Sequence, residues 1–162
     1  MSASRTAVSL EQRRTAHLIV SAGSRACAIP IPHVVETMRP LPVDFIGGAP
    51  PFLLGLTVVR GLPVPVVDLQ AVVGTGGTEA ISRFVALRLG GRSVVLAVTA
   101  VIGLRELDGI RVEDMPPLLR EARADVVEAI GVLDAQLLLV LRASRILPEE
   151  VWRTLSTREL SS

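Results

Sequence analysis

Apolar residues in this chain of 162 residues gather in many short runs that glycine, proline and polar residues separate. Short apolar runs bounded by turn residues are typical of β-strands. Strand pairs joined by tight turns are predicted at 18–21 and 26–29, 55–60 and 62–67, 83–89 and 92–98, and 129–133 and 137–141. Further strands are expected at 36–38, 101–107 and 110–112. About ten short strands with frequent turns favour β-barrels or a sandwich over βαβ units.

Helices are expected only as short pieces between these strands and as a C-terminal tail. Proline is tolerated in a first helical turn, so 30–35 is predicted to contain a short helix. Asp68 is suited to cap a short helical turn that ends at Gly74. The tail from 143 to 160 is predicted to be helical, with an interruption at Pro148, which has no N–H to donate. The segment 40–51 is expected to be a surface loop, and 115–123 is expected to be an irregular or weakly helical link.

Prolines also limit how one strand can pair. Pro63 and Pro65 both fall in the predicted strand at 62–67, and neither can donate to a β-ladder. That strand must therefore have at least one edge that no neighbouring strand pairs with along these residues.

The charge balance argues against nucleic acid as a partner. Seventeen basic and sixteen acidic residues are spread along the chain and give a net charge of +1. No long run of one sign is present to bind a phosphate backbone. The aromatic residues are too few and too scattered for a base-stacking platform: Phe45, Phe52, Phe84 and Trp152.

Cysteine usage and hydropathy favour a reducing, cytoplasmic location. Cys27 is the only cysteine, so no intramolecular disulfide can form. No apolar run approaches the roughly 20 residues that a membrane-spanning helix needs, and no signal-peptide core opens the chain. Direct insertion into a membrane is therefore not expected, and residues 1–15 are predicted to be a flexible arm.

The residues that usually carry catalysis are scarce, and neither an enzyme nor a metal or cofactor site is expected. His17, His33 and Cys27 lack the spacing of a ligand set or of a nucleophile–base pair. The chain has no lysine, asparagine or tyrosine, so the glycine-rich stretch 74–78 lacks the lysine of a phosphate-binding loop. A solvated face explains a group of carboxylates that shows no acid–base pattern, and a small hydrolase using such scattered carboxylates is a remote alternative: Asp108, Glu113, Asp114, Glu121, Asp125 and Glu128.

A central segment carries a family resemblance. Residues 55–69 read G-L-T-V-V-R-G-L-P-V-P-V-V-D-L, which closely resembles the CheW signature G-V-x-N-L-R-G-x-(I/V)-(I/V)-P-(I/V)-(I/V)-D-L. These residues fall in register with it: Gly55, Arg60, Gly61, Pro65, Asp68 and Leu69. Residues 28–36 are similar to the family's short helix ending in V-x-E-I, and 137–141 with 145–147 are similar to its last strand and turn.

The resemblance implies a mostly β fold. The family has two intertwined five-stranded SH3-like β-barrels around a shared apolar core, with short helices and a C-terminal helix. On this basis residues 16–150 form the CheW-like domain, made of two barrel subdomains, and 151–162 form a helical tail.

The resemblance also implies a function. Proteins of this family are non-catalytic adaptors that couple chemoreceptors to the CheA histidine kinase. One barrel pairs with the kinase's regulatory domain, and the groove between the barrels accepts the cytoplasmic tip of a methyl-accepting receptor. The chain is then expected in the cytoplasm, recruited to receptor arrays at the inner face of the membrane.

Partner-binding positions follow from the same resemblance. A buried Arg60 would require a carboxylate, and the resemblance implies Glu36 as its neighbour on the partner-facing surface. A purely structural ion pair is the alternative. The positions expected at or beneath the partner surfaces are Val34, Glu36, Gly55, Arg60 and Gly61, together with the apolar Leu62, Val64 and Val101.

The chain departs from the family pattern at several positions. Val58 stands where asparagine is usual and Cys27 where an aromatic is common. Thr99 and Gly103 replace aspartates, and Ala129 replaces a glycine. An alternative is therefore a divergent module that binds only the kinase, or one that serves a pathway controlling twitching motility or gene expression.

Overall fold

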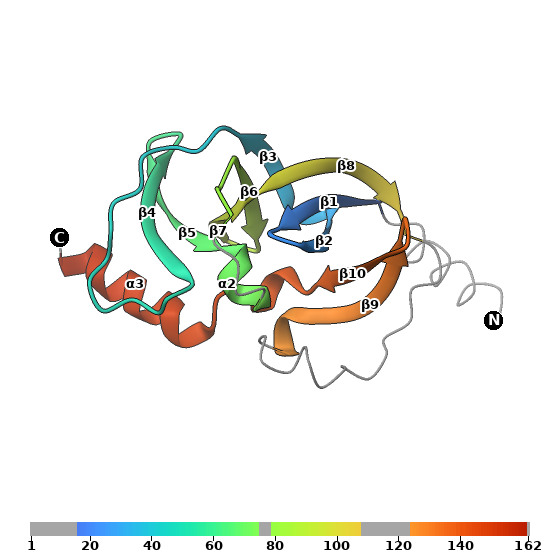
Figure 1. The fold of residues 1–162 in the computed structure, drawn as a ribbon. Helices are drawn as coiled ribbons and strands as arrows, with labels where there is room; N and C mark the ends of the chain where they lie inside the picture. Colours follow the sequence, from blue (N-terminus) through green and yellow to red (C-terminus); the bar gives the residue numbers. More distant parts are fainter. Residues whose placement is uncertain (1–15, 75–78, 108–123, 162) are drawn as a thin grey trace, which may run out of the picture.

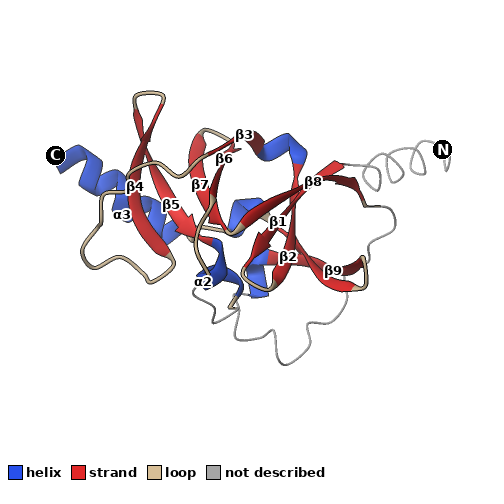
Figure 2. Ribbon diagram, turned by 45° about the horizontal axis from the view of Figure 1, so that its top comes forward, coloured by secondary structure: helices blue, strands red, loops and turns tan. Residues whose placement is uncertain are grey.

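The computed structural model describes residues 16–74, 79–107 and 124–161. These residues form two five-stranded β-sheets that lie side by side, with a few short helices (Figures 1 and 2). The mostly β class and the pair of five-stranded units expected for SH3-like barrels are confirmed. The expected arm at 1–15, strand at 110–112 and link at 115–123 lie outside the described residues.

The first sheet combines strands from both ends of the chain, in the order β8-β1-β2-β10-β9. Its members are β1 (Ala16–Ala22), β2 (Arg25–Pro30), β8 (Ala100–Glu106), β9 (Val127–Leu133) and β10 (Gln136–Leu141). The second sheet takes the middle of the chain, in the order β3-β6-β7-β5-β4. Its members are β3 (Val34–Met38), β4 (Leu53–Val59), β5 (Leu62–Asp68), β6 (Arg83–Leu89) and β7 (Arg92–Val98).

The two sheets share one topology. Each is built on a central hairpin, β1–β2 or β6–β7, whose second strand pairs in parallel with β10 or β5. A second hairpin, β9–β10 or β4–β5, completes one side, and β8 or β3 adds an antiparallel edge on the other. The fold is therefore a structural repeat, with β3, β6, β7, β5 and β4 equivalent to β8, β1, β2, β10 and β9.

Neither sheet is closed into a barrel by strand pairing among the described residues. In the second sheet, Asp44 of the 40–51 loop forms a bridge to Leu56 of β4. The N–H groups of Asp44 and Leu56 each donate to the other residue's carbonyl oxygen, at 2.7 and 2.9 Å. The predicted loop at 40–51 thus contributes a short bridge to β4 and is otherwise irregular.

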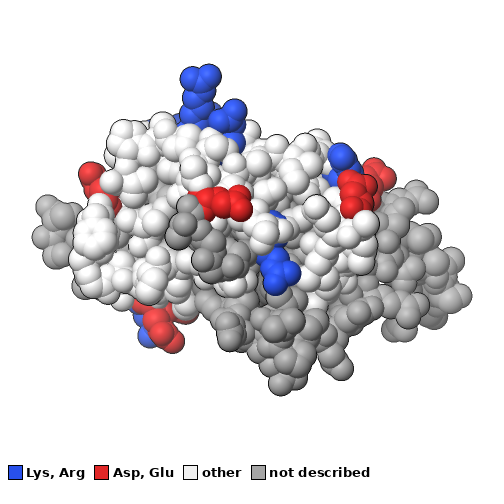
Figure 3. All heavy atoms as spheres, viewed as in Figure 1, with Lys and Arg blue, Asp and Glu red and all other residues white. Residues whose placement is uncertain are grey.

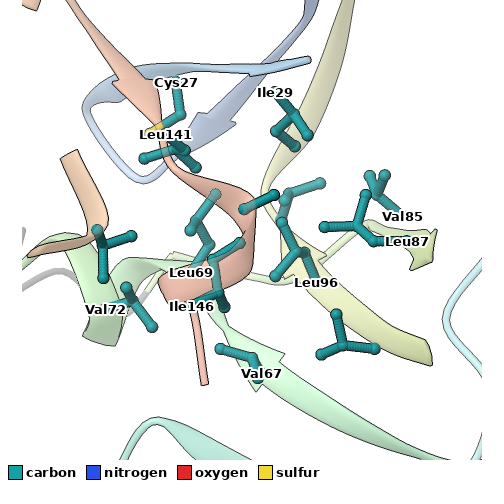
Figure 4. Close-up of a cluster of buried hydrophobic side chains, with 14 of the residues drawn as sticks. Cys27, Ile29, Val67, Leu69, Val72, Val85, Leu87, Leu96, Leu141 and Ile146 are labelled. Carbon is teal, nitrogen blue, oxygen red and sulfur yellow. The ribbon is translucent and has the colours of Figure 1, made fainter. Parts of the chain in front are cut away.

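Strands at the centre of the molecule contain unbroken apolar runs because both of their faces are buried there. On β7, Val94, Leu96 and Val98 face a core shared by the two sheets, whereas Val95 and Ala97 belong to a cluster of the second sheet alone. The first sheet encloses a corresponding cluster around Ile19 and Leu138. Figure 4 shows side chains from both sheets meeting in the shared core, among them Cys27, Ile29, Leu87 and Leu96.

Short helices precede or follow several of the strands. Asp68 caps α2 (Leu69–Val73) as predicted, since its Oδ1 accepts the Gln70 N–H at 3.1 Å. Gly74 ends this helix in the left-handed conformation, with φ of 69°. The remaining short elements are the 3-10 helices η1 (Ile31–His33), η3 (Ala124–Val126) and η4 (Ala143–Arg145).

The C-terminal helix is interrupted where proline predicts it. The 3-10 helix η4 precedes Pro148, and α3 (Glu149–Ser161) begins directly after it. Val151, Trp152 and Leu155 of α3 pack against the shared core. The helix therefore lies against the second sheet's side of the molecule (Figure 1).

The proline-containing strand has the unpaired edge that the sequence requires. β5 pairs with β4 along its length, but it pairs with β7 only from Val66 to Asp68. Along Leu62–Pro65 the two strands diverge, and recesses open between them.

Candidate functional site

One end of the second sheet carries most of the residues that the sequence singles out. The tip of the β4–β5 hairpin, the start of β3 and the tip of the β6–β7 hairpin surround a recess of about 170 Å³, here called the Arg60 recess. Its lining residues are Val35, Glu36, Val59, Arg60, Leu62, Val64, Ala86, Leu87, Arg88, Ser93, Val94 and Val95.

Arg60 and Glu36 form the ion pair that the resemblance implies. The Nε–H of Arg60 donates to Oε2 of Glu36 at 2.8 Å. Arg60 and Gly61 form the β4–β5 turn with φ of 51° and 81°, as two-residue hairpin turns with positive φ require. The turn holds Arg60 in solvent, so that 76% of its side chain is exposed, against 30% for Glu36. The pair therefore does not compensate a buried charge.

The hydrogen bond to Glu36, followed by their Coulomb attraction, raises the pKa of Arg60 above its usual value. Arginine is protonated at any physiological pH in any case, so the charge of Arg60 does not switch. Solvent screens an ion pair this exposed, and such pairs contribute little to the stability of a fold.

Apolar side chains stand exposed around this ion pair. Leu62 is 67% exposed, and Val35 is 57% exposed on β3. Both line the Arg60 recess. Val58, at 62% exposed, lies on the other face of the same hairpin, paired with Pro63. Sequence reasoning did not place Val35 or Val58 at the site, although Val58 was noted as a departure from the family signature.

The remaining predicted residues of the second sheet are buried or partly buried. Val34 is partly buried against the shared core, and Val64 is buried in the second sheet's own cluster. Gly55 is buried in β4 with φ of 150°. A Cβ at that position would stand 2.0 Å from the carbonyl oxygen of Asp44. Gly55 thus permits the close approach of the 40–51 loop to β4.

Val101 is the one predicted residue that lies apart from the recess. It belongs to β8 of the first sheet and packs against the shared core. The structural repeat relates it to Val34, because each residue precedes a one-residue register shift in its edge strand. Val34 pairs with Leu87 and Val101 pairs with Val20, at equivalent places in the two sheets.

The repeat places exposed apolar residues at both ends of the molecule. Ile102 occupies the bulge equivalent to Val35, and it is exposed as well. Val132 precedes the β9–β10 turn as Val58 precedes the β4–β5 turn, and it too is exposed. The two ends differ in charge. Gly103 occupies the position equivalent to Glu36, and Asp134 occupies the position equivalent to Arg60.

Two further departures from the family pattern have structural roles. Cys27 is fully buried in the shared core, and burial raises the pKa of its thiol to about 12, so the thiol stays protonated at neutral pH. The Thr99 hydroxyl donates to the Ser21 carbonyl at 2.7 Å and accepts the Gly23 N–H at 3.2 Å. These two hydrogen bonds join the β7–β8 connection, which links the two sheets, to the β1–β2 turn of the first sheet.

Candidate catalytic or ligand-binding groups do not gather in the described part of the chain. Within residues 16–74, 79–107 and 124–161, no three His, Cys, Asp or Glu side chains are arranged to hold a metal ion. The carboxylates Asp108, Glu113, Asp114 and Glu121 lie outside the described residues. On the face seen in Figure 3, charged side chains form a few small groups on a largely uncharged surface.

No helix among the described residues has both the length and the apolar character to cross a membrane.

Comparisons with known proteins agree with this geometry. The family model described as CheW-like domain matches residues 16–151. Among solved structures, the fold is similar to the scaffolding protein TtCheW from Thermoanaerobacter tengcongensis, with a TM-score of 0.69. That likeness covers 80% of this chain and 89% of the other, at 23% sequence identity. Because the family model matches most of the chain, the chain belongs to the CheW-like family of chemotaxis adaptor domains.

Proposed function

We propose that the chain is a non-catalytic adaptor that couples methyl-accepting chemoreceptors to a CheA-type histidine kinase in the cytoplasm, at receptor arrays. The observation that carries the proposal is the exposed Glu36–Arg60 pair beside the exposed side chains of Val35 and Leu62 at the Arg60 recess. Exposed apolar clusters rimmed by polar groups mark protein–protein contacts. Membership of the CheW-like family supports the same function.

The ion pair has a clearer use in recognition than in stability. Exposed pairs of this kind contribute little to folding, but arginine is enriched at the energetic centres of interfaces. A partner that covers Arg60 and Leu62 would remove the solvent that now screens the charges. We assign the kinase's regulatory domain to this end of the second sheet.

An adaptor needs a second contact, and the structural repeat offers surface for it. Val34 and Val101 occupy equivalent positions on the two sheets, and both pack at the shared core. The receptor tip is proposed to dock between the sheets, where both residues are partly buried against the shared core. Val34, Gly55, Val64 and Val101 would then support partner surfaces from beneath, while Glu36, Arg60, Gly61 and Leu62 touch the partner.

The decisive measurement is co-elution of the purified protein with the regulatory domain of the CheA kinase from the same organism. Arg60→Glu is expected to abolish the complex at micromolar concentration while leaving the melting temperature nearly unchanged. The doubly substituted protein Glu36→Arg/Arg60→Glu restores an ion pair of reversed direction. If the pair serves recognition, this double variant stays unable to bind.

A structural role gives the opposite pattern. Each single substitution would then lower the melting temperature, and the double substitution would recover both stability and binding. Arg83→Glu is the matched control, because Arg83 is an exposed arginine of the same sheet that lies outside the Arg60 recess. Failure of the unsubstituted protein to form any complex would refute the coupling function.

One observation favours a specialised partner. Val58 replaces the asparagine of the family signature at an exposed position of the β4–β5 hairpin. A kinase adapted to this chain would present an apolar group opposite Val58. Such a kinase would belong to a separate pathway, one that controls twitching motility or gene expression. Val58→Asn is then expected to weaken binding to the cognate kinase and to strengthen binding to a flagellar one.

A further inference from the structure

The inner face of the second sheet leads from its apolar cluster to a charged rim. Successive side chains of a strand alternate between its two faces. On β6, Phe84 and Ala86 belong to the second sheet's own cluster, so Arg88 projects from the same face one step further along. Arg88 is exposed and lines the Arg60 recess. The strand thus directs a guanidinium toward the opening of the recess.

Glu36 reaches the same opening from the neighbouring strand. It pairs with Ala86 across β3 and β6, and Met38, two residues on, packs against the second sheet's cluster. Alternation therefore directs Glu36 to the inner face as well. Two strands and one hairpin tip converge there, each with one charged side chain.

The charges at this opening do not balance. Two arginines and one glutamate line the recess. Glu36 is engaged by Arg60, whereas Arg88 has no ion pair or hydrogen bond with any residue in the described part of the chain. The recess therefore presents one uncompensated guanidinium beside the apolar walls of Val59, Leu62 and Val64.

We propose that the Arg60 recess receives one acidic side chain, aspartate or glutamate, from the kinase's regulatory domain, and that its carboxylate pairs with Arg88. This inference rests on the proposed function and names the chemistry of its contact. A recess of about 170 Å³ admits a single side chain rather than a helix. Its apolar walls cover the methylene groups of the entering residue and exclude water, which strengthens the ion pair.

The alternatives for this pocket are less favourable. An apolar side chain filling the recess would remove the water around the Arg88 guanidinium and would supply no acceptor or opposite charge in its place. An unpaired buried charge is costly. A basic side chain would add a like charge beside two guanidiniums. A carboxylate supplies two acceptor oxygens to the planar fork of an arginine, which is the geometry that this side chain binds best.

The test is the affinity of the full chain for the purified regulatory domain, measured by titration calorimetry at low and at high salt. Arg88→Glu is expected to weaken binding at least about tenfold, as loss of one desolvated charge pair does. Arg88→Gln, which keeps hydrogen-bond donors but no charge, is expected to lose less and to lower the salt dependence. Arg83→Glu on the same strand changes net charge equally and is expected to bind as the original protein does.

The outcomes separate this inference from the proposed function. If the original protein binds and Arg88→Glu binds equally well, the acidic contact is refuted and the coupling function stands. If Arg88→Glu and Arg83→Glu weaken binding by the same factor, net charge alone acts and the recess contact is again refuted. If the original protein does not bind at all, the proposed function fails and this contact fails with it. Equal melting temperatures of the three variants show that folding does not cause the difference.

Discussion

Gly55 and Gly103 have the same unusual backbone conformation in very different surroundings. Each lies in a strand with φ of 150°, a region that residues with a side chain rarely adopt. A Cβ on Gly55 would stand 2.0 Å from the Asp44 carbonyl oxygen, whereas a Cβ on Gly103 would meet only the flexible end of Arg105 at 3.6 Å. The Asp44 oxygen is held in place because it accepts the Leu56 N–H at 2.9 Å.

This contrast predicts the effects of two alanine substitutions. Gly103→Ala is expected to cost about 1–3 kcal/mol of unfolding free energy from backbone strain alone. Gly55→Ala carries the same strain and in addition must displace the 40–51 loop, so it is expected to cost clearly more. Urea denaturation of both variants gives the comparison. Equal losses would show that the contact with Asp44 does not constrain β4.

The resemblance placed Gly55 in register with the family signature, but its physical role depends on Asp44. That residue lies in a segment that was expected to be irregular, and no local pattern connects it to β4. Arg60 is a similar case. Its pairing with Glu36 agrees with the resemblance, but its exposure follows from the hairpin turn.

The first turn of α3 is anchored by Arg92. Arg92 donates two hydrogen bonds to the carboxylate of Glu149, both at 2.8 Å. Its guanidinium also lies 5.0 Å from the centre of the Trp152 ring. Recesses of about 250 Å³ and about 300 Å³ flank the helix, one against the 40–51 loop and one against the free edge of β5. The helix is therefore anchored at its first turn and incompletely packed along its sides.

This anchor predicts a pH dependence. The hydrogen bonds from Arg92 lower the pKa of Glu149 below its usual value of about 4.5. The stabilisation from the pair is therefore fully present above that value and is lost as pH falls through the lowered pKa. Trp152 is the only tryptophan and the chain has no tyrosine, so fluorescence reports on α3 directly. Its emission is expected to change in a step below pH 4.5.

Glu149→Gln and Glu150→Gln are the matched pair for this experiment. The first should remove the acidic step, because no titrating partner of Arg92 remains at that position. The second should preserve it, since the hydrogen bonds and the ion pair of Arg92 in the described part of the chain go to Glu149 and not to Glu150. A step that persists in Glu149→Gln would mean that another group controls the docking of α3.

At the scale of the whole molecule, the shared core makes the two sheets a single unit. Its buried side chains come from both sheets and from the helices between them, with Leu69 and Ile146 entering from α2 and from the turn after η4. The chain forms β1 and β2 of the first sheet, then all of the second sheet, and then returns to complete the first, so the first sheet is not a continuous segment. The two sheets are therefore expected to unfold together.

Leu96→Ala tests this cooperativity. Leu96 is fully buried in the shared core, and its truncation is expected to cost about 2–5 kcal/mol of unfolding free energy. Leu104→Ala is the control, because Leu104 is exposed on β8 and its loss is expected to change stability by less than about 0.5 kcal/mol. Trp152 fluorescence and far-ultraviolet circular dichroism should give coincident transitions in every variant. Separate transitions would mean that the sheets unfold independently.

Among the described residues, the sequence by itself indicated the strand pairs, their tight turns, the Asp68 cap and the break before the C-terminal helix. Apolar runs, the Gly90-Gly91 turn, the Asp68 cap and the break at Pro148 are local features, and each acts on residues close to it in the chain. The free edge of β5 also followed from the sequence, because a proline lacks an N–H in any tertiary setting.

Only the tertiary structure decided which strands meet and which side chains reach the surface. The parallel pairs β2–β10 and β5–β7 join segments distant in the chain, and their register depends on packing in the shared core. Strands buried on both faces carry no polar alternation, so the sequence does not mark which residues face which cluster. For the same reason the exposure of Val35 and Val58, and the convergence of Arg88 with Glu36 at one recess, follow from the fold alone.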